Sequence, residues 1–170
     1  MPISFHVGGG RIPVPVPAEG ALATQIASED ELSQNQHVYK SVTGTLGQLS
    51  GAPWLISIIM SGTCEKFPNF QFVMGECGAA WVPFVLGRMD HIYMDRGSNG
   101  EFDPPLTMLP SEYWYRQGAT TFQEEPYIGH MVDLIGEDNV IWGSDYPHPD
   151  SVWPDSKEII RQTLGSLEPK

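Results

Sequence analysis

The stretch Phe70–Glu76 (FQFVMGE) is the clearest strand signal in the sequence. Its aromatic and branched residues stand between Pro68-Asn69 and Gly75, which are residue types that bound strands. Two further strands are predicted at Asn139–Ser144 (NVIWGS) and at Pro2–Val7 (PISFHV). All three runs are short and nearly uncharged, which is typical of strands buried in a sheet.

Helices are predicted between these strands. Apolar residues recur at helical spacing over His37–Phe67, and Gly51-Ala52-Pro53 interrupts them, which indicates two helical pieces. The other predicted helical segments are Ala79–Met94, Pro126–Ile135 and Asp155–Leu167, with another short segment at Ser111–Phe122. Strands that alternate with helices predict an α/β fold with a parallel sheet, either a (β/α) barrel or a doubly wound sheet.

A long loop is predicted at 11–36, where the sequence is rich in Pro, Gly and polar residues. Pro13, Pro15 and Pro17 alternate with valine, a pattern that favours extended, polyproline-like backbone. A loop of this length is either a functional lid or binding loop, or an unstructured insertion.

Composition excludes several classes of partner. The 170 residues correspond to about one domain, and the formal net charge of −12 lacks the basic surface that nucleic acid or an anionic membrane requires. The longest apolar run, Trp54–Met60, is too short to span a bilayer. The N-terminus lacks the features of a secretory signal, so a cytoplasmic location is expected. Cys64 and Cys77 lie in apolar surroundings and are predicted to be buried, reduced thiols.

Polar residues stand where the three predicted strands end. These residues are His6, Glu76 and Asp145. Parallel strands place their carboxyl ends at one rim, where sites are built, so we expect the three side chains to converge there.

Each of the three residues has two possible roles. His6 is either a metal ligand or a structural histidine. Glu76 is either a proton-transfer group, with a pKa raised by its apolar neighbours, or a cap for the following helix. Asp145 lies in the run Trp142–His148 (WGSDYPH), where it is either a metal ligand and proton acceptor or part of an Asx-type turn that leaves His148 on the surface.

Several motifs in order resemble one family. They are Glu65–Pro83 (EKFPNFQFVMGECGAAWVP), Arg88-Met89-Asp90, Pro110–Tyr113 (PSEY) and Trp142–His148. This series is similar to the amidohydrolase-related family that includes aminocarboxymuconate-semialdehyde decarboxylase. The resemblance implies a (β/α)8 TIM barrel with a divalent metal, often zinc and sometimes manganese. It also implies hydrolysis or nonoxidative decarboxylation of a small carboxylic acid.

The resemblance assigns roles to individual residues. His6 matches the metal-binding histidine that ends the family's fifth strand, and Asp145 matches the aspartate that ends the eighth. Asp145 is therefore expected to serve both as metal ligand and as catalytic group, together with Glu76. Glu76 stands where the decarboxylase has a histidine that serves the substrate. His148 and Trp81 are the expected substrate contacts.

The resemblance covers only the C-terminal part of such a barrel. Residues 1–170 correspond to units five to eight, with the long loop at 11–36, and no His-x-His or Glu-x-His ligand pair precedes His6. We therefore expect a partial TIM barrel, weak zinc binding, little turnover by this chain alone, and association of copies over its exposed sheet edges. Two functions remain open. The chain is a fragment of a metal-dependent hydrolase or decarboxylase of a small-molecule substrate, or it is a noncatalytic remnant that acts as a binding or assembly module.

Overall fold

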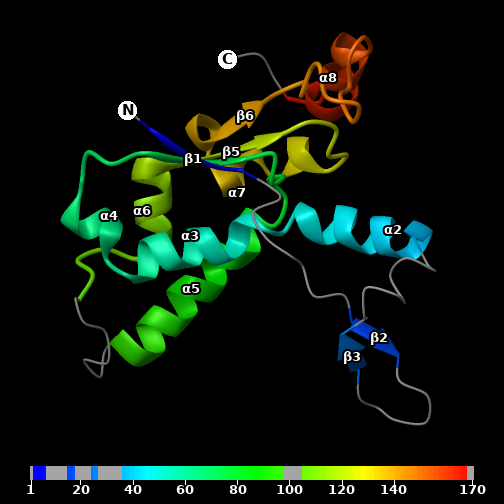
Figure 1. The fold of residues 1–170 in the computed structure, drawn as a ribbon. Coiled ribbons are helices and arrows are strands. Elements are labelled where there is room, and N and C mark those ends of the chain that lie inside the picture. The colour runs from blue at the N-terminus through cyan, green and yellow to red at the C-terminus, as the bar shows by residue number, and fades with distance from the viewer. Residues whose placement is uncertain (1, 7–14, 18–23, 27–35, 98–104, 168–170) are drawn as a thin grey trace.

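The computed structural model describes residues 2–6, 15–17, 24–26, 36–97 and 105–167. Its main feature is a four-stranded sheet of β1 (Ile3–His6), β4 (Phe72–Gly75), β5 (Gly118–Phe122) and β6 (Val140–Trp142). Every pairing is parallel, and the strands lie in the order β1-β4-β5-β6 (Figure 1). The predicted α/β class with a parallel sheet is confirmed.

The register brings the carboxyl ends of the strands to one end of the sheet, which we call the C-terminal rim. His6 lies opposite Gly75 in the pair β1 and β4, and Phe122 lies opposite Trp142 in the pair β5 and β6. The residues that follow β4 and β6, Glu76 and Asp145, therefore leave the sheet at the same rim as His6.

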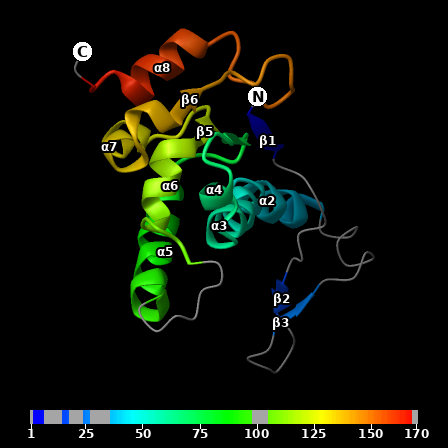
Figure 2. The ribbon, with the colours of Figure 1, turned by 90° about the vertical axis from the view of Figure 1, so that its left-hand side faces the viewer.

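Helices pack against the sheet and against one another. The longer ones are α2 (Gln36–Gly47), α3 (Gly51–Met60), α5 (Val82–Gly97), α6 (Pro110–Gln117) and α8 (Ser156–Leu164), and the short ones are α4 (Thr63–Lys66) and α7 (Val132–Ile135). The 3-10 helices η1 (Ile128–His130) and η2 (Glu137–Asn139) flank α7. In both views α3 and α5 lie below the strands, and α8 lies above them (Figures 1 and 2).

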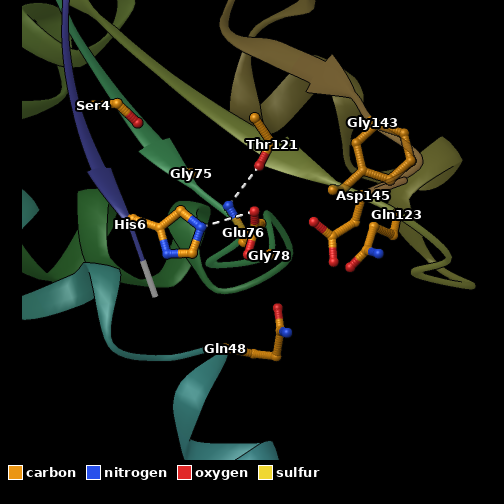
Figure 3. A pocket seen from close by; sticks show the side chains of 11 residues that line it. Ser4, His6, Gln48, Gly75, Glu76, Gly78, Thr121, Gln123, Gly143 and Asp145 are labelled. Atoms are coloured by element: carbon orange, nitrogen blue, oxygen red, sulfur yellow. Dashed lines mark hydrogen bonds and ion pairs between the residues drawn. The ribbon is translucent and has the colours of Figure 1, made fainter. Parts of the chain in front are cut away.

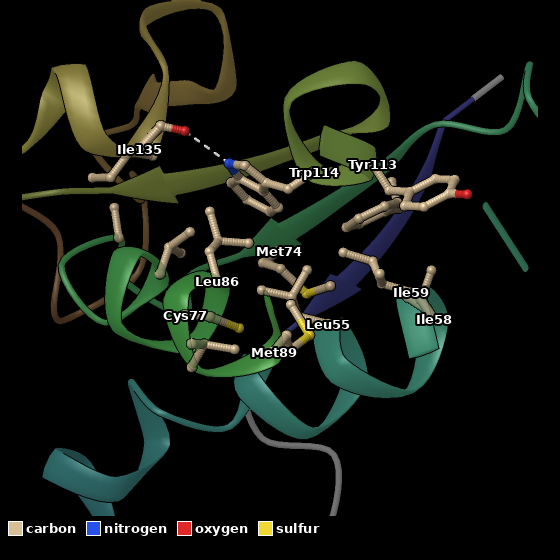
Figure 4. Close-up of a cluster of buried hydrophobic side chains, with 14 of the residues drawn as sticks. Leu55, Ile58, Ile59, Met74, Cys77, Leu86, Met89, Tyr113, Trp114 and Ile135 are labelled. Carbon is tan, nitrogen blue, oxygen red and sulfur yellow. Dashed lines mark hydrogen bonds between the residues drawn. The ribbon is translucent and has the colours of Figure 1, made fainter. Parts of the chain in front are cut away.

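The hydrophobic core lies between the sheet and helices α3, α5 and α6 (Figure 4). Leu55, Met74 and Trp114, from α3, β4 and α6, are fully buried. The Trp114 indole Nε1 donates a hydrogen bond to the Ile135 carbonyl oxygen at 2.7 Å. The bond gives the only polar atom of the buried indole a hydrogen-bond partner. It also links α6 to α7.

The sequence pattern did not reveal β5. The segment predicted at 111–122 as one piece divides into α6 and β5. β5 (GATTF) lacks a strong apolar run because Thr120 takes a fully buried position on it. The Thr120 hydroxyl donates to the Gly78 carbonyl oxygen at 2.7 Å, which makes a polar residue acceptable at a core position.

The two helical pieces predicted over His37–Phe67 are present as α2 and α3, and the break lies at 48–50, just before the predicted Gly51-Ala52-Pro53. These three residues form the first turn of α3, where a backbone N–H has no acceptor within the helix and proline is therefore tolerated. One helix prediction needs correction. The helix predicted over Pro126–Ile135 is not continuous, because the 3-10 turn η1 precedes a single turn of α helix in α7.

The predicted loop at 11–36 contains a two-stranded antiparallel sheet of β2 (Pro15–Pro17) and β3 (Thr24–Ile26). The extended backbone predicted near Pro15 is present, but it pairs with a strand instead of forming an isolated polyproline helix. The rest of 11–35, with Pro13, lies outside the described residues, as does Val7. Cys64 and Cys77 are both buried and free, as predicted.

Candidate active site

A cavity of about 240 Å³ opens at the C-terminal rim, and we call it the rim cavity (Figure 3). Residues from all four strands or their following loops line it, and a glutamine that directly follows helix α2 completes the lining. The lining is Ser4, His6, Gln48, Gly75, Glu76, Gly78, Thr121, Phe122, Gln123, Gly143 and Asp145. The three residues predicted at the strand ends therefore share one cavity, although His6 and Asp145 belong to opposite edges of the four-stranded sheet.

Glu76 and Asp145 have an unusual backbone conformation. Their φ angles are 54° and 57°, and among the described residues they are the two non-glycine residues with a positive φ. A side chain in this left-handed region meets its own carbonyl oxygen, at a cost of roughly 1–2 kcal/mol per residue. Strain of this kind is concentrated at functional sites, where the surrounding structure holds it in place.

Glu76 and His6 form a pair across neighbouring strands. The Glu76 Oε1 atom lies 2.8 Å from His6 Nε2. The Glu76 backbone N–H donates to the Thr121 hydroxyl at 2.7 Å, so β5 holds the turn that aims this carboxylate (Figure 3). The His6 side chain is 61% exposed and that of Glu76 is 33% exposed, so water reaches the pair.

Asp145 and His148 form a second pair after β6. The Asp145 Oδ2 atom lies 3.1 Å from His148 Nδ1, and the His148 backbone N–H donates to the Asp145 carbonyl oxygen at 2.8 Å. The Asp145 side chain is 16% exposed, whereas that of His148 is 61% exposed. Asp145 lines the rim cavity. His148 contacts Asp145 and is not among the lining residues that the structure describes.

Residues from β5 and its following loop shape the β4–α5 loop. The Glu125 carboxylate accepts hydrogen bonds from the backbone N–H groups of Ala79 and Ala80, at 2.6 and 2.7 Å. Burial raises the pKa of Glu125, and these two hydrogen bonds oppose the increase. Together with Thr120 and Thr121, Glu125 fixes the segment that carries Glu76. The sequence pattern predicts none of these three residues, because Thr120 and Thr121 lie in β5 and Glu125 follows it, and that strand has no strong apolar pattern.

Comparison with known proteins decides the family. The amidohydrolase family model matches residues 2–169. The chain belongs to the amidohydrolase family.

Several of the proteins that the chain resembles are decarboxylases. Over 109 residues the chain is 28% identical to 2-amino-3-carboxymuconate-6-semialdehyde decarboxylase of Dictyostelium discoideum, covering 57% of this chain and 30% of that protein. It also resembles the crystal structure of 5-carboxyvanillate decarboxylase from Sphingomonas paucimobilis, with 27% identity and a TM-score of 0.56, covering 68% of this chain and 34% of that one.

A third similarity extends over more of the chain. Dihydroxybenzoic acid decarboxylase from Polaromonas sp. JS666, solved with bound manganese and the inhibitor 2-nitroresorcinol, has 15% identity and a TM-score of 0.56. The match covers 84% of this chain and 42% of that one. The chain thus has the fold of part of an amidohydrolase TIM barrel, and it spans about a third of the length of the curated relative that it matches.

The amidohydrolase fold implies a divalent metal, and the described residues offer part of a ligand set. Within them, no three His, Cys, Asp or Glu side chains come together closely enough to hold a metal ion. The imidazole of His6 and the carboxylate of Asp145 are suitable donors, but catalytic zinc sites usually have three protein ligands. The described part of the amidohydrolase chain therefore does not form a complete metal site.

Trp81 lies beside the rim cavity and not in its lining. Its indole Nε1 donates to the Cys77 carbonyl oxygen at 2.6 Å, and the residue lines a neighbouring cavity.

In the described ranges of this amidohydrolase, no helix has the length and apolar character needed to cross a membrane.

Proposed function

We propose that the chain carries part of the active site of a metal-dependent decarboxylase that acts on a small aromatic or unsaturated carboxylic acid. The observation that carries the proposal is the shared cavity of Glu76 and Asp145, two carboxylates held in strained backbone at the rim. Strain of this kind marks a functional rim, and the similarity to decarboxylases supports a catalytic role over the noncatalytic alternative. The relatives at 28% and 27% identity are both named decarboxylases, which supports decarboxylation over hydrolysis.

His6 and Asp145 are the proposed metal ligands of this chain. Their donor atoms, an imidazole nitrogen and a carboxylate oxygen, suit Zn²⁺ or Mn²⁺, and manganese is present in the dihydroxybenzoic acid decarboxylase structure. A bound divalent ion would supply Lewis-acid stabilisation of a substrate oxygen. The ligands that complete the set are not among the described residues.

Glu76 and Asp145 are the proposed proton-transfer groups. When the carbon–carbon bond of a substrate carboxylate breaks, its electron pair stays on the substrate carbon, which then takes a proton while carbon dioxide leaves. Glu76 Oε1 shares a hydrogen-bonded contact with His6 Nε2, so this pair can hold a proton beside the cavity. Asp145 is more buried than Glu76 and is held by the turn that follows β6, so it can deliver or accept a proton at a fixed position.

His148 and Trp81 remain the proposed substrate contacts. His148 presents an exposed imidazole next to Asp145, where a protonated ring would attract a substrate carboxylate. Trp81 presents an aromatic ring at the side of the rim cavity, in the direction that a planar substrate would extend.

Release of carbon dioxide tests the proposal. The complete chain is incubated with Mn²⁺ or Zn²⁺ in excess and with a panel of aromatic and unsaturated carboxylic acids, and carbon dioxide and products are measured over long times. We expect slow, metal-dependent release for at least one acid, and a loss of 10²-fold or more in Asp145→Asn. Release that does not depend on metal or on Asp145, or hydrolysis products without carbon dioxide, would overturn the proposal.

A further inference from the structure

A second cavity of about 500 Å³ adjoins the rim cavity, and we call it the side cavity. The two cavities share Gln48, Gly78 and Gln123 in their linings, so a ligand can extend from one into the other. The remaining lining residues of the side cavity are Leu49, Ala80, Trp81, Glu124, Glu125 and Pro126.

One part of the side cavity suits a flat apolar group. Trp81, Leu49 and Pro126 supply an aromatic ring and two aliphatic surfaces. The hydrogen bond from Trp81 Nε1 to the Cys77 carbonyl oxygen holds the ring in place, so its aromatic surface is available without further ordering. Rigid aromatic walls of this kind bind planar groups at low entropic cost.

The other part of the side cavity is acidic. Glu124 and Glu125 line it, and no lysine or arginine does so among the residues that the structure describes. Burial raises the pKa of Glu124, and the nearby carboxylate of Asp150 raises it further. Both Glu125 oxygens accept backbone hydrogen bonds, so that carboxylate is fixed in place. Glu124 is exposed at the edge of the side cavity and Glu125 is partly buried, and two negative groups on one wall of a cavity attract cations and repel anions.

We propose that the side cavity binds the distal part of the substrate, and that this part is a planar group bearing an ammonium or hydroxyl substituent and no second carboxylate. The proposal rests on the proposed function, because it takes the rim cavity as the place where the reacting carboxylate lies. Trp81 and Glu124 are then the residues that determine specificity. Trp81 supplies affinity for the ring, and Glu124 supplies the preference for a cationic or donating substituent.

Three probes of the same shape and different charge test this inference. Benzylamine, benzyl alcohol and benzoate are titrated into the complete chain at pH 8 and low salt, without metal, while the indole N–H signal of Trp81 is followed by NMR. We expect protonated benzylamine to bind at least tenfold more tightly than benzoate, with benzyl alcohol between them. Equal binding, or tighter binding of benzoate, would overturn the proposal.

Matched variants test whether Glu124 causes the preference for benzylamine over benzoate and whether Trp81 binds the ring. Glu124→Gln should reduce the benzylamine-to-benzoate ratio to about threefold or less with little effect on benzyl alcohol. Trp81→Leu, in which the backbone amide signals of Ala80 and Gln123 are followed instead of the indole, should weaken all three probes. Glu158→Gln removes one carboxylate from the exposed surface of α8 and should leave the ratio unchanged. An unchanged ratio in Glu124→Gln, with an unfolding midpoint like that of the parent chain, would contradict the assignment. Because the measurement involves neither metal nor turnover, its failure is separate from a failure of the proposed function.

Discussion

Glu76 and Asp145 adopt the same left-handed backbone conformation at the ends of two parallel strands, with φ angles of 54° and 57°. Both carboxylates face the rim cavity, and each is paired with a histidine. Non-glycine residues in left-handed backbone are costly for folding, and strain of this kind is concentrated at functional sites, so both carboxylates mark this rim as functional.

The strain at Glu76 can be measured by comparing two small replacements. Glycine adopts a positive φ freely and alanine does not, so Glu76→Gly should be more stable than Glu76→Ala by about 1 kcal/mol. In α8 the order should reverse, with Gln162→Ala about 1 kcal/mol more stable than Gln162→Gly. Urea unfolding of the four variants checks both orders. An alanine variant at least as stable as the glycine variant at position 76 would contradict the left-handed backbone.

Glu125 should make the stability of the protein depend on pH. Burial raises its pKa in the folded state, so its contribution to stability is fully present below the unfolded pKa and is lost as pH rises through the folded pKa. The destabilisation caused by Glu125→Gln should therefore become smaller as pH rises above about 4.5. The free energy of unfolding of both chains, measured from pH 4 to pH 8, checks this trend. A cost that grows with pH would mean that the two backbone hydrogen bonds outweigh burial.

The two cysteines should be unreactive in the folded chain. Burial raises the pKa of Cys64 to about 11, although Arg116 opposes the increase, and burial also raises the pKa of Cys77. The thiolate is the reactive form, so at pH 8 a thiol reagent such as Ellman's reagent should modify neither residue before unfolding and both in urea. Rapid modification of one thiol in the folded chain would show that the core around α4 or the β4–α5 loop opens.

The positions of His6, Glu76 and Asp145 could be predicted because each lies at or just after the end of a short strand, and parallel strands end at one rim. The contributions of Thr121, Gln123 and Glu125 could not be predicted in the same way. Thr121 lies in β5, and Gln123 and Glu125 follow it. This strand contains Thr120 at a fully buried position, so its hydrophobic pattern is too weak to reveal a strand.

Strand order was also beyond the sequence pattern. His6 and Asp145 belong to opposite edges of the described sheet. The sequence pattern does not predict this arrangement, because the order of strands depends on contacts between segments that are far apart in the chain. Local periodicity gives each strand separately but not its neighbours. The pairing of each carboxylate with its own histidine follows from this order and from the turn after β6.

We propose that the rim holds a metal site to which His6 and Asp145 contribute. Titration of the complete chain with Mn²⁺, followed by paramagnetic broadening of backbone amide signals, tests it most directly. We predict broadening centred on His6, Glu76 and residues 143–145, with binding weakened about tenfold or more in Asp145→Asn and unchanged in Asp133→Asn, which alters an exposed carboxylate on α7. Asparagine tolerates a positive φ, so the turn itself should survive. Broadening spread over the acidic surface, or equal binding by the Asp145→Asn chain, would contradict the claim.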